Sequence, residues 1–364
     1  MKENRFLFYT ILINMVSNII VFVPHILFNG LFDGALMSIL ISVVIGMTLL
    51  VLGTQSLAQF PGESLPEVME RYLPRWFRVI FLSYISSFWY VAGVIVLLAF
   101  STIMTRYLSP ETGQFTILFF LSLTVLLVVP LKSSRLLNGL EILFVINIPL
   151  IAIILLKSVL EKNTDWEDVY DVCTHLVHLP TLTMIAAASY IFTGYTNLVI
   201  FNKETAIKLK KRHYLILGGL GFATLMTSFF IPIGRLGEFS VNRYTFPWIP
   251  TSDSISMQYF VIERMMIPFL LVYLMVALVQ AVMHWHIGYH LILSLFRQQR
   301  KWQNYAVLAA FTLGVGVLQK ILDNEYILFE FATYWLIARL FSEIGLVALL
   351  IYLAKRRRRH EQQI

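Results

Sequence analysis

Long apolar runs separated by short polar connectors occupy almost all of the 364-residue chain. A helix needs about 20 predominantly apolar residues to cross the hydrocarbon core of a bilayer. Runs of roughly that length recur from end to end, and each is predicted to be a transmembrane helix. They lie at residues 6–27, 35–52, 77–104, 115–129, 136–156, 182–201, 214–233, 265–296, 305–322 and 327–353. The pattern therefore predicts an all-α integral membrane protein with about ten transmembrane helices.

The basic residues indicate on which side of the membrane each connector lies. If the N-terminus is cytoplasmic, 20 of the 28 Lys and Arg residues fall in cytoplasmic segments and 7 fall in outer connectors. Cytoplasmic loops of membrane proteins carry such an excess. We therefore expect a multi-pass protein of the cell membrane with both termini cytoplasmic, and a basic tail at residues 355–364 that contacts anionic lipids.

The composition excludes several classes of function. Hydrophobic residues make up 58% of the chain and charged residues 13%, which leaves no polar segment long enough for a separate catalytic domain. The basic residues that give the net charge of +7 lie mainly in the connectors and the tail, so nucleic-acid binding is not expected. With Cys173 as the single cysteine and no motif of a hydrolase, kinase or dinucleotide enzyme, we expect no enzyme activity and no cofactor. His284, His286 and His290 lack a nearby carboxylate or cysteine, so no metal site is expected.

Ten helices divide as five plus five within a single membrane domain, with repeats predicted at about 6–160 and 181–354. When a repeat contains an odd number of helices, the second repeat must cross the membrane in the opposite orientation to the first. In such folds the substrate lies near the midplane, where the first helix of each repeat is interrupted. The first and sixth runs therefore become the candidates for a binding site.

Polar residues do interrupt both of these runs. Asn14, Ser17 and Asn18 lie in the middle of the first run, and Thr193, Gly194 and Tyr195 lie in the middle of the sixth. Backbone groups freed by unwinding there suit the carboxylate and ammonium of an amino acid. The competing interpretation is helix packing by small and polar residues.

Two charged residues lie inside the last predicted helix. Arg339 and Glu343 are four residues apart, so their side chains share one helical face. Ionisable residues within a membrane usually face the bundle interior or a water-filled cavity. A structural ion pair and a ligand contact both fit this spacing.

The whole chain resembles the spore germination permease family, the B subunit of GerA-type nutrient germinant receptors. The resemblance lies in the stretches NIIVFVP at 18–24, LPEVME at 65–70 and FTGY at 192–195, together with the basic tail. This family belongs to the amino acid–polyamine–organocation superfamily, which implies a LeuT-like five-plus-five inverted repeat with broken helices one and six. The resemblance further implies a subunit of the spore inner membrane that binds an amino acid or similar nutrient, works with A and C subunits, and signals germination.

The repeat geometry adds Tyr90 and Val94 of the third run, and Tyr273 of the eighth, to the predicted binding site. Sodium-coupled relatives use hydroxyls on the eighth helix, yet residues 264–290 contain no Ser or Thr. This favours a receptor subunit over a pump. A proton-coupled secondary amino acid transporter is the main alternative, and an assembly subunit without ligand binding is a further one.

Overall fold

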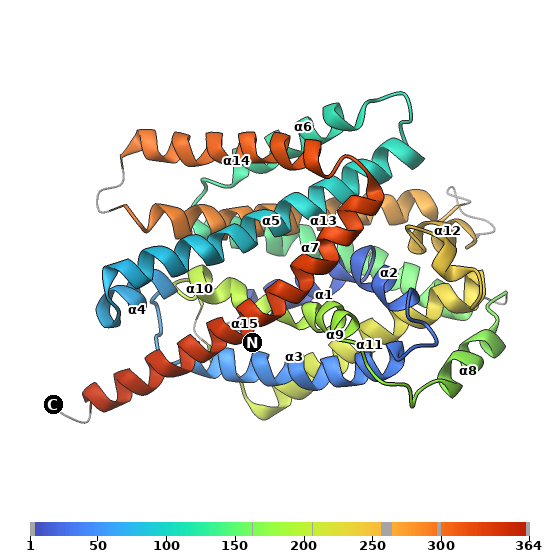
Figure 1. The fold of residues 1–364 in the computed structure, drawn as a ribbon, viewed down its shortest axis with the longest axis horizontal. Helices are drawn as coiled ribbons and strands as arrows, with labels where there is room; N and C mark the ends of the chain where they lie inside the picture. The colour runs from blue at the N-terminus through green and yellow to red at the C-terminus, as the bar shows by residue number, and fades with distance from the viewer. Residues whose placement is uncertain (1–3, 162, 206, 256–263, 297–299, 362–364) are drawn as a thin grey trace.

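The chain forms a bundle of helices (Figure 1). The computed structural model describes residues 4–161, 163–205, 207–255, 264–296 and 300–361, and the regular elements in these ranges are all helical. Within these ranges, eight helices are long and apolar enough to cross a membrane, and the bent pair α1–α2 makes up to a ninth span. The apolar helix α6 has 15 residues and takes the place of the fourth predicted run. The predicted all-α membrane fold is confirmed.

The helices follow the predicted runs closely. Those of the bundle are α1 (Arg5–Asn18), α2 (Phe22–Phe28), α3 (Ala35–Leu57), α5 (Arg75–Tyr107), α6 (Gln114–Val128), α7 (Ser133–Leu160), α9 (Leu182–Ser189), η2 (Tyr190–Asn197), α10 (Leu198–Phe201), α11 (Lys211–Leu236), α13 (Met266–Leu293), α14 (Lys301–Ile321) and α15 (Glu325–Glu361). Short helices in the connectors are α4 (Leu65–Tyr72), α8 (Trp166–Thr174), η3 (Val241–Arg243) and α12 (Trp248–Asp253).

The first span is broken in the middle. Helices α1 and α2 meet at 47° across residues 19–21. The bend frees the backbone carbonyl of Ile19, and the hydroxyl of Ser228 on α11 donates to it at 2.6 Å. Pro24 lies in the first turn of α2, where its missing N–H removes no helical hydrogen bond. Non-helical backbone inside a membrane needs such partners, because lipid offers none.

The sixth span is interrupted in a different way. It runs as α9, then the 3₁₀ segment η2, then the single turn α10. The chain is not unwound at this point; the eight residues of η2 are wound more tightly than an α-helix. A 3₁₀ stretch of this length is uncommon and marks a point where side chains must satisfy part of the backbone.

The bundle has two distinct ends (Figure 1). One, the terminal end, carries α4 and both described ends of the chain: the Asn4 side chain bonds to the backbone of Lys208, and Arg356 of α15 donates to the carbonyl of Tyr72. The other, the α8 end, carries α8, η3 and α12.

Helices α5 and α13 pack together along much of their length and form one wall of the interior. The Trp285 indole donates to the carbonyl of Tyr90 at 3.1 Å, and the Ser86 hydroxyl donates to the carbonyl of Gly288 at 2.8 Å. Facing this wall are α1, η2 and α15. The space between the two groups holds the central cavity.

Candidate functional site

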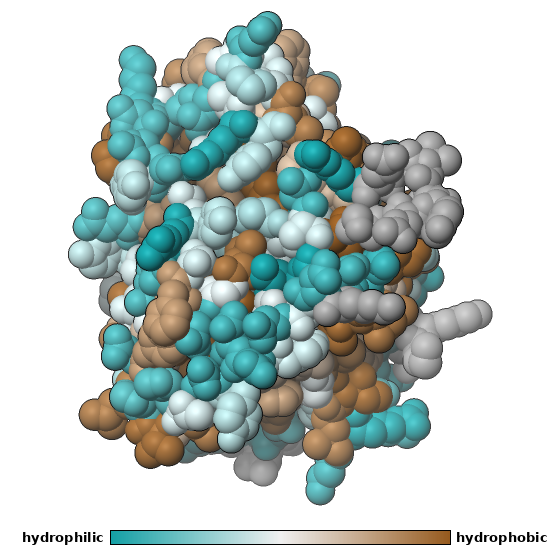
Figure 2. Space-filling model, turned by 90° about the vertical axis from the view of Figure 1, so that its right-hand side faces the viewer, coloured by the Kyte–Doolittle hydropathy of each residue, from teal (hydrophilic) through white to brown (hydrophobic). Residues whose placement is uncertain are grey.

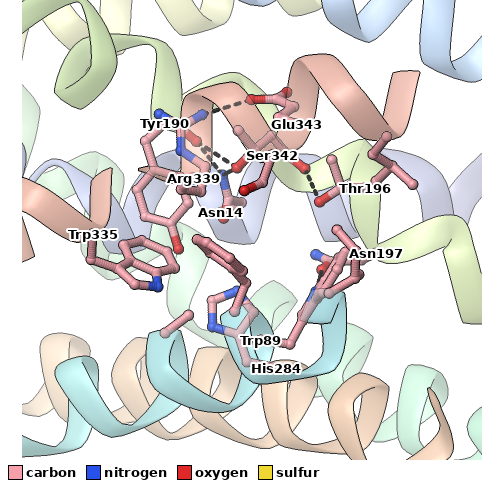
Figure 3. A pocket seen from close by; sticks show the side chains of 15 residues that line it. Asn14, Trp89, Tyr190, Thr196, Asn197, His284, Trp335, Arg339, Ser342 and Glu343 are labelled. Atoms are coloured by element: carbon pink, nitrogen blue, oxygen red, sulfur yellow. Dashed lines mark hydrogen bonds and ion pairs between the residues drawn. The ribbon is translucent and has the colours of Figure 1, made fainter. Parts of the chain in front are cut away.

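A cavity of about 50 Å³ lies in the middle of the bundle (Figure 3). Its walls come from α1, α5, η2, α13 and α15, so all the interrupted spans and both long central helices contribute. The lining residues are Asn14, Ile85, Phe88, Trp89, Ala92, Tyr190, Thr193, Thr196, Asn197, His284, Trp335, Arg339, Ser342, Glu343 and Leu346.

Arg339 of α15 supplies the positive charge of this cavity. Its guanidinium contacts Glu343 Oε2 at 2.6 Å and donates to the carbonyl of Ala186 and to Ser189 Oγ at 3.2 Å. The same group lies over the Tyr190 ring, 4.9 Å from its centroid. Arg339 therefore joins α15 to the interrupted sixth span, and its charge is matched by a buried carboxylate.

Glu343 supplies the negative charge of the cavity, and each of its two carboxylate oxygens accepts one hydrogen bond. Oε2 pairs with Arg339, and Oε1 accepts from the Tyr195 hydroxyl at 2.8 Å. Its side chain is 3% exposed and that of Arg339 is 8% exposed. A buried pair is held against its desolvation cost only when further hydrogen bonds complete it, and Tyr195, Ser189 and Ala186 supply them.

Asn14 of α1 ties the two interrupted spans together. Its Nδ2 donates to the Tyr190 carbonyl at 2.8 Å and to Thr193 Oγ1 at 3.2 Å. Its Oδ1 accepts from Gln280 Nε2 at 2.9 Å, and the same Nε2 lies 3.0 Å from His284 Nε2. The tight winding of η2 is thus supported by an amide side chain from a neighbouring span.

The opposite wall in Figure 3 carries Trp89 and His284. The Trp89 indole donates to Asn197 Oδ1 at 3.0 Å, which connects α5 with η2. Aromatic and aliphatic side chains, Phe88 and Ile85 among them, surround this polar contact. One side of the cavity is therefore charged and the other is largely apolar.

Several buried polar atoms around the cavity have no hydrogen-bond partner among the described residues. They are Arg339 Nε, Trp335 Nε1, His284 Nδ1 and Gln280 Oε1. Buried polar groups are nearly always paired, and each unpaired one has a free-energy cost. The two N–H groups of Arg339 and Trp335 are donors, so an acceptor placed in the cavity would satisfy them.

Four of the residues predicted from the sequence line the cavity: Asn14, Thr193, Arg339 and Glu343. Tyr195 reaches it indirectly through its bond to Glu343. Ser17 and Asn18 both donate to the carbonyl of Asn14, at 3.1 and 2.7 Å, and so support α1 just below the break.

Gly194 lies where the sixth span touches the first. A Cβ atom at this position would lie 2.5 Å from Ile11 Cα and 2.7 Å from the carbonyl of Thr10. The backbone freedom that the sequence indicated is not used, because the residue stays in the 3₁₀ helix. Gly194 allows close approach of η2 to α1.

The predicted residues of the third and eighth runs lie outside the cavity. The Tyr90 hydroxyl donates to the carbonyl of Phe311 on α14 at 2.8 Å. Tyr273 packs against Phe100, with 5.3 Å between ring centroids, and Val94 is fully buried in the core. These three residues are packing residues of the α5–α13 wall.

Sequence reasoning missed most of the aromatic lining. Trp89, Tyr190 and Trp335 were not singled out, and His284 was considered only as a metal ligand. Spacing gave a partial signal, because Trp335 lies one turn before Arg339, and Trp89 directly precedes Tyr90 in a helix already expected at the site. Of the three neighbouring histidines, only His284 lines the cavity, and His286 bonds to Ser133 and to the carbonyl of Val129.

Comparisons with known proteins agree with this architecture. A solved structure of Mhp1, a nucleobase-cation-symport-1 family transporter in a closed conformation with bromovinylhydantoin bound, is similar with a TM-score of 0.59. The two chains are 14% identical, and the match covers 96% of this chain and 79% of the Mhp1 chain. No curated protein sequence matches.

The chain is therefore a membrane protein of the LeuT-type transporter fold, with first and sixth spans interrupted beside a central cavity. The family model for spore germination proteins matches residues 3–324. The chain belongs to this spore germination permease family, which makes it a membrane transporter or a receptor-like protein of that fold.

Proposed function

We propose that this protein is the nutrient-sensing transmembrane subunit of a spore germinant receptor, and that it binds an amino acid in the central cavity. The observation that carries the proposal is the buried Arg339–Glu343 pair at the cavity wall, beside donors that have no partner. Membership of the spore germination family supports the role in germination.

The charges of the cavity favour a ligand that carries one positive and one negative group and has no net charge. Arg339 and Glu343 neutralise each other, so a ligand with a net charge would enter a low-dielectric space without compensation. A zwitterion avoids this cost. Its carboxylate would accept from the free N–H groups of Arg339 and Trp335, and its ammonium would face the Glu343 carboxylate.

The apolar wall would hold the side chain of the ligand. Ile85, Phe88 and Ala92 of α5 line this part of the cavity. The space beside Ala92 favours a small or medium aliphatic group over a charged one.

A receptor subunit would act by a shift between two helix arrangements that the ligand stabilises to different degrees. Its A and C partner subunits, and its place in the spore inner membrane with cytoplasmic termini, belong to the same proposal. The second candidate is a proton-coupled amino acid transporter. It is favoured by Glu343, a buried carboxylate in the pathway that can exchange a proton.

A binding and flux assay on reconstituted liposomes tests the proposal. Labelled amino acids are screened with and without a pH gradient, alongside the N-acetylated acid and the decarboxylated amine of each ligand that binds. We expect saturable binding of an amino acid, loss of binding for both single-charge analogues, and no accumulation. Gradient-driven accumulation would establish the transporter instead, and equal binding of the analogues would contradict the zwitterion site.

A further inference from the structure

Helix α13 reaches the central cavity through the imidazole of His284. Of the described residues of α13, only His284 lines the cavity, and it is 4% exposed. The largely hydrophilic α8 end of the molecule (Figure 2) contributes none of the described lining residues from α8, η3 or α12. Polar partners for a ligand in the cavity therefore come from interior side chains, and His284 is one of them.

The orientation of the Asn14 amide is fixed by its partners on the sixth span. Its side-chain nitrogen lies 2.8 Å from the Tyr190 carbonyl oxygen and 3.2 Å from that of Ile191. Carbonyl oxygens only accept, so the atom that faces them is the donor Nδ2. The other amide atom, Oδ1, is then an acceptor, and the side-chain atom of Gln280 that lies 2.9 Å from it is the donor Nε2.

Gln280 in turn fixes the tautomer of His284. The Nε2 atom of Gln280 carries two hydrogens, one directed at Asn14 and the other at His284 Nε2, 3.0 Å away. An amide nitrogen does not accept a hydrogen bond, so His284 Nε2 presents its lone pair. Protonating this nitrogen would set two N–H groups against each other. The ring is therefore neutral, with its single proton on Nδ1.

The N–H group at Nδ1 of His284 is a buried donor that has no partner among the described residues. A buried donor without a partner raises the free energy of the folded protein. Arg339 Nε and Trp335 Nε1 are in the same condition around the same cavity. A carboxylate has two oxygens with about four lone-pair sites, so these two donors alone do not complete its hydrogen bonding.

We propose that His284 contacts the ligand, and that its neutral imidazole donates from Nδ1 to the ligand carboxylate from the wall opposite Arg339 (Figure 3). The proposal rests on the proposed amino-acid ligand and names the carboxylate as the group that the site selects. The carboxamide of an amino acid has an NH₂ group in place of one carboxylate oxygen, and that group would meet the Nδ1 donor. The cavity is therefore expected to reject the carboxamide of the amino acid that it binds.

Two substitutions separate the roles of the two ring nitrogens. His284→Gln keeps an acceptor for Gln280 but has no donor in the place of Nδ1, and His284→Asn keeps an N–H near Nδ1 but loses the bond to Gln280. Equilibrium binding to the full chain in lipid nanodiscs is measured for the amino acid that binds best and for its carboxamide. His284→Gln is expected to weaken amino-acid binding by about ten- to hundredfold and to reduce the preference for the acid, whereas His284→Asn keeps that preference. His290→Gln, the same change on α13 outside the cavity, is the matched control.

Nitrogen-15 NMR of the full chain with labelled histidine measures the tautomer without a ligand. Protonated and bare ring nitrogens give well-separated signals, and His284 is identified by the signals that either His284 variant lacks. We expect the proton on Nδ1 at neutral pH, and a change in the Nδ1 signal when the amino acid is added. A proton on Nε2, or equal amino-acid binding by His284→Gln and His290→Gln, would overturn the contact and leave the proposed function standing. Absence of saturable binding by the unmodified protein would overturn both.

Discussion

Arg339 and Glu343 show at the residue scale why a charge pair is retained inside this bundle. The two side chains form a salt bridge with each other, and the Tyr195 hydroxyl donates to the other carboxylate oxygen of Glu343. Replacing a buried pair by apolar residues is often harmless, but removing one partner leaves an uncompensated charge. Each charge of the pair therefore needs the other, and the pair also links α15 to the sixth span.

Glu343→Gln is expected to lower the free energy of unfolding by about 3–5 kcal/mol, because it leaves the buried Arg339 guanidinium without its counter-charge. Tyr195→Phe removes one hydrogen bond to a charged group and should cost about 1.5–3 kcal/mol. Thermal melting of the detergent-solubilised protein measures both, with the exposed Glu111→Gln as control. Equal melting temperatures for Glu343→Gln and the control would show that the pair does not stabilise the bundle.

Gly194 makes a packing prediction of its own. Gly194→Ala places a Cβ within 2.5 Å of Ile11 Cα, so α1 and η2 must move apart. Overpacking of this kind costs about 1–3 kcal/mol. Gly219 on α11 has no atom within 4 Å of the corresponding Cβ position, so Gly219→Ala is the matched control. A melting temperature for Gly194→Ala at or above that of Gly219→Ala would contradict the close approach.

At the element scale, two helices of the site meet the same segment at the terminal end. Asn202, which follows α10, donates to the carbonyls of Phe60 and Glu63 at 2.6 and 2.9 Å. Arg357 of α15 donates to the carbonyl of Gln59 and lies over the Phe60 ring. The connector at residues 58–64 is therefore held by the sixth span and by α15 at once. A change at the cavity that moves either helix is therefore expected to alter the hydrogen bonds of this connector.

Ligand binding is accordingly expected to change hydrogen exchange in the connector 58–64 and in α4. The physical reason is that the backbone carbonyls of the connector bond to residues on the two helices that contact the ligand. Exchange is measured by mass spectrometry with and without saturating amino acid. The connector 109–113 at the α8 end, which neither helix holds in this way, is the internal control. Equal changes in the two connectors, or none in 58–64, would argue against this coupling.

The hydrophobic pattern was sufficient to predict the elements but only part of the site. Ten apolar runs located the spans because a bilayer fixes their length. Polar interruptions pointed to Asn14 and Thr193, since polar groups in lipid need partners, and both residues line the central cavity. Trp335 and Tyr90 show where this reasoning stops: both are aromatics in spans near the cavity, yet one lines it and the other bonds to α14. That difference depends on how each helix is rotated, which the packing of neighbouring helices decides.

At the scale of the whole molecule, the sixth span and α15 join the central cavity to the connector 58–64 at the terminal end. This link fits a protein that reports a bound ligand at that end. The α5–α13 wall stays tightly packed throughout, with Trp285 against Tyr90 and Phe311. We therefore expect the wall to be the fixed part, and α15 with the interrupted spans to be the moving part.

The most direct test of the central claim is to fill the central cavity. Ala92→Leu adds volume to the apolar wall, and Ala310→Leu makes the same change on an exposed face of α14. Equilibrium binding of the amino acid is titrated for both variants, with melting temperatures as the check on folding. We predict that Ala92→Leu weakens binding by at least about tenfold, or 1.4 kcal/mol, while Ala310→Leu binds normally. Undiminished affinity in a folded Ala92→Leu protein would mean that the amino acid binds elsewhere.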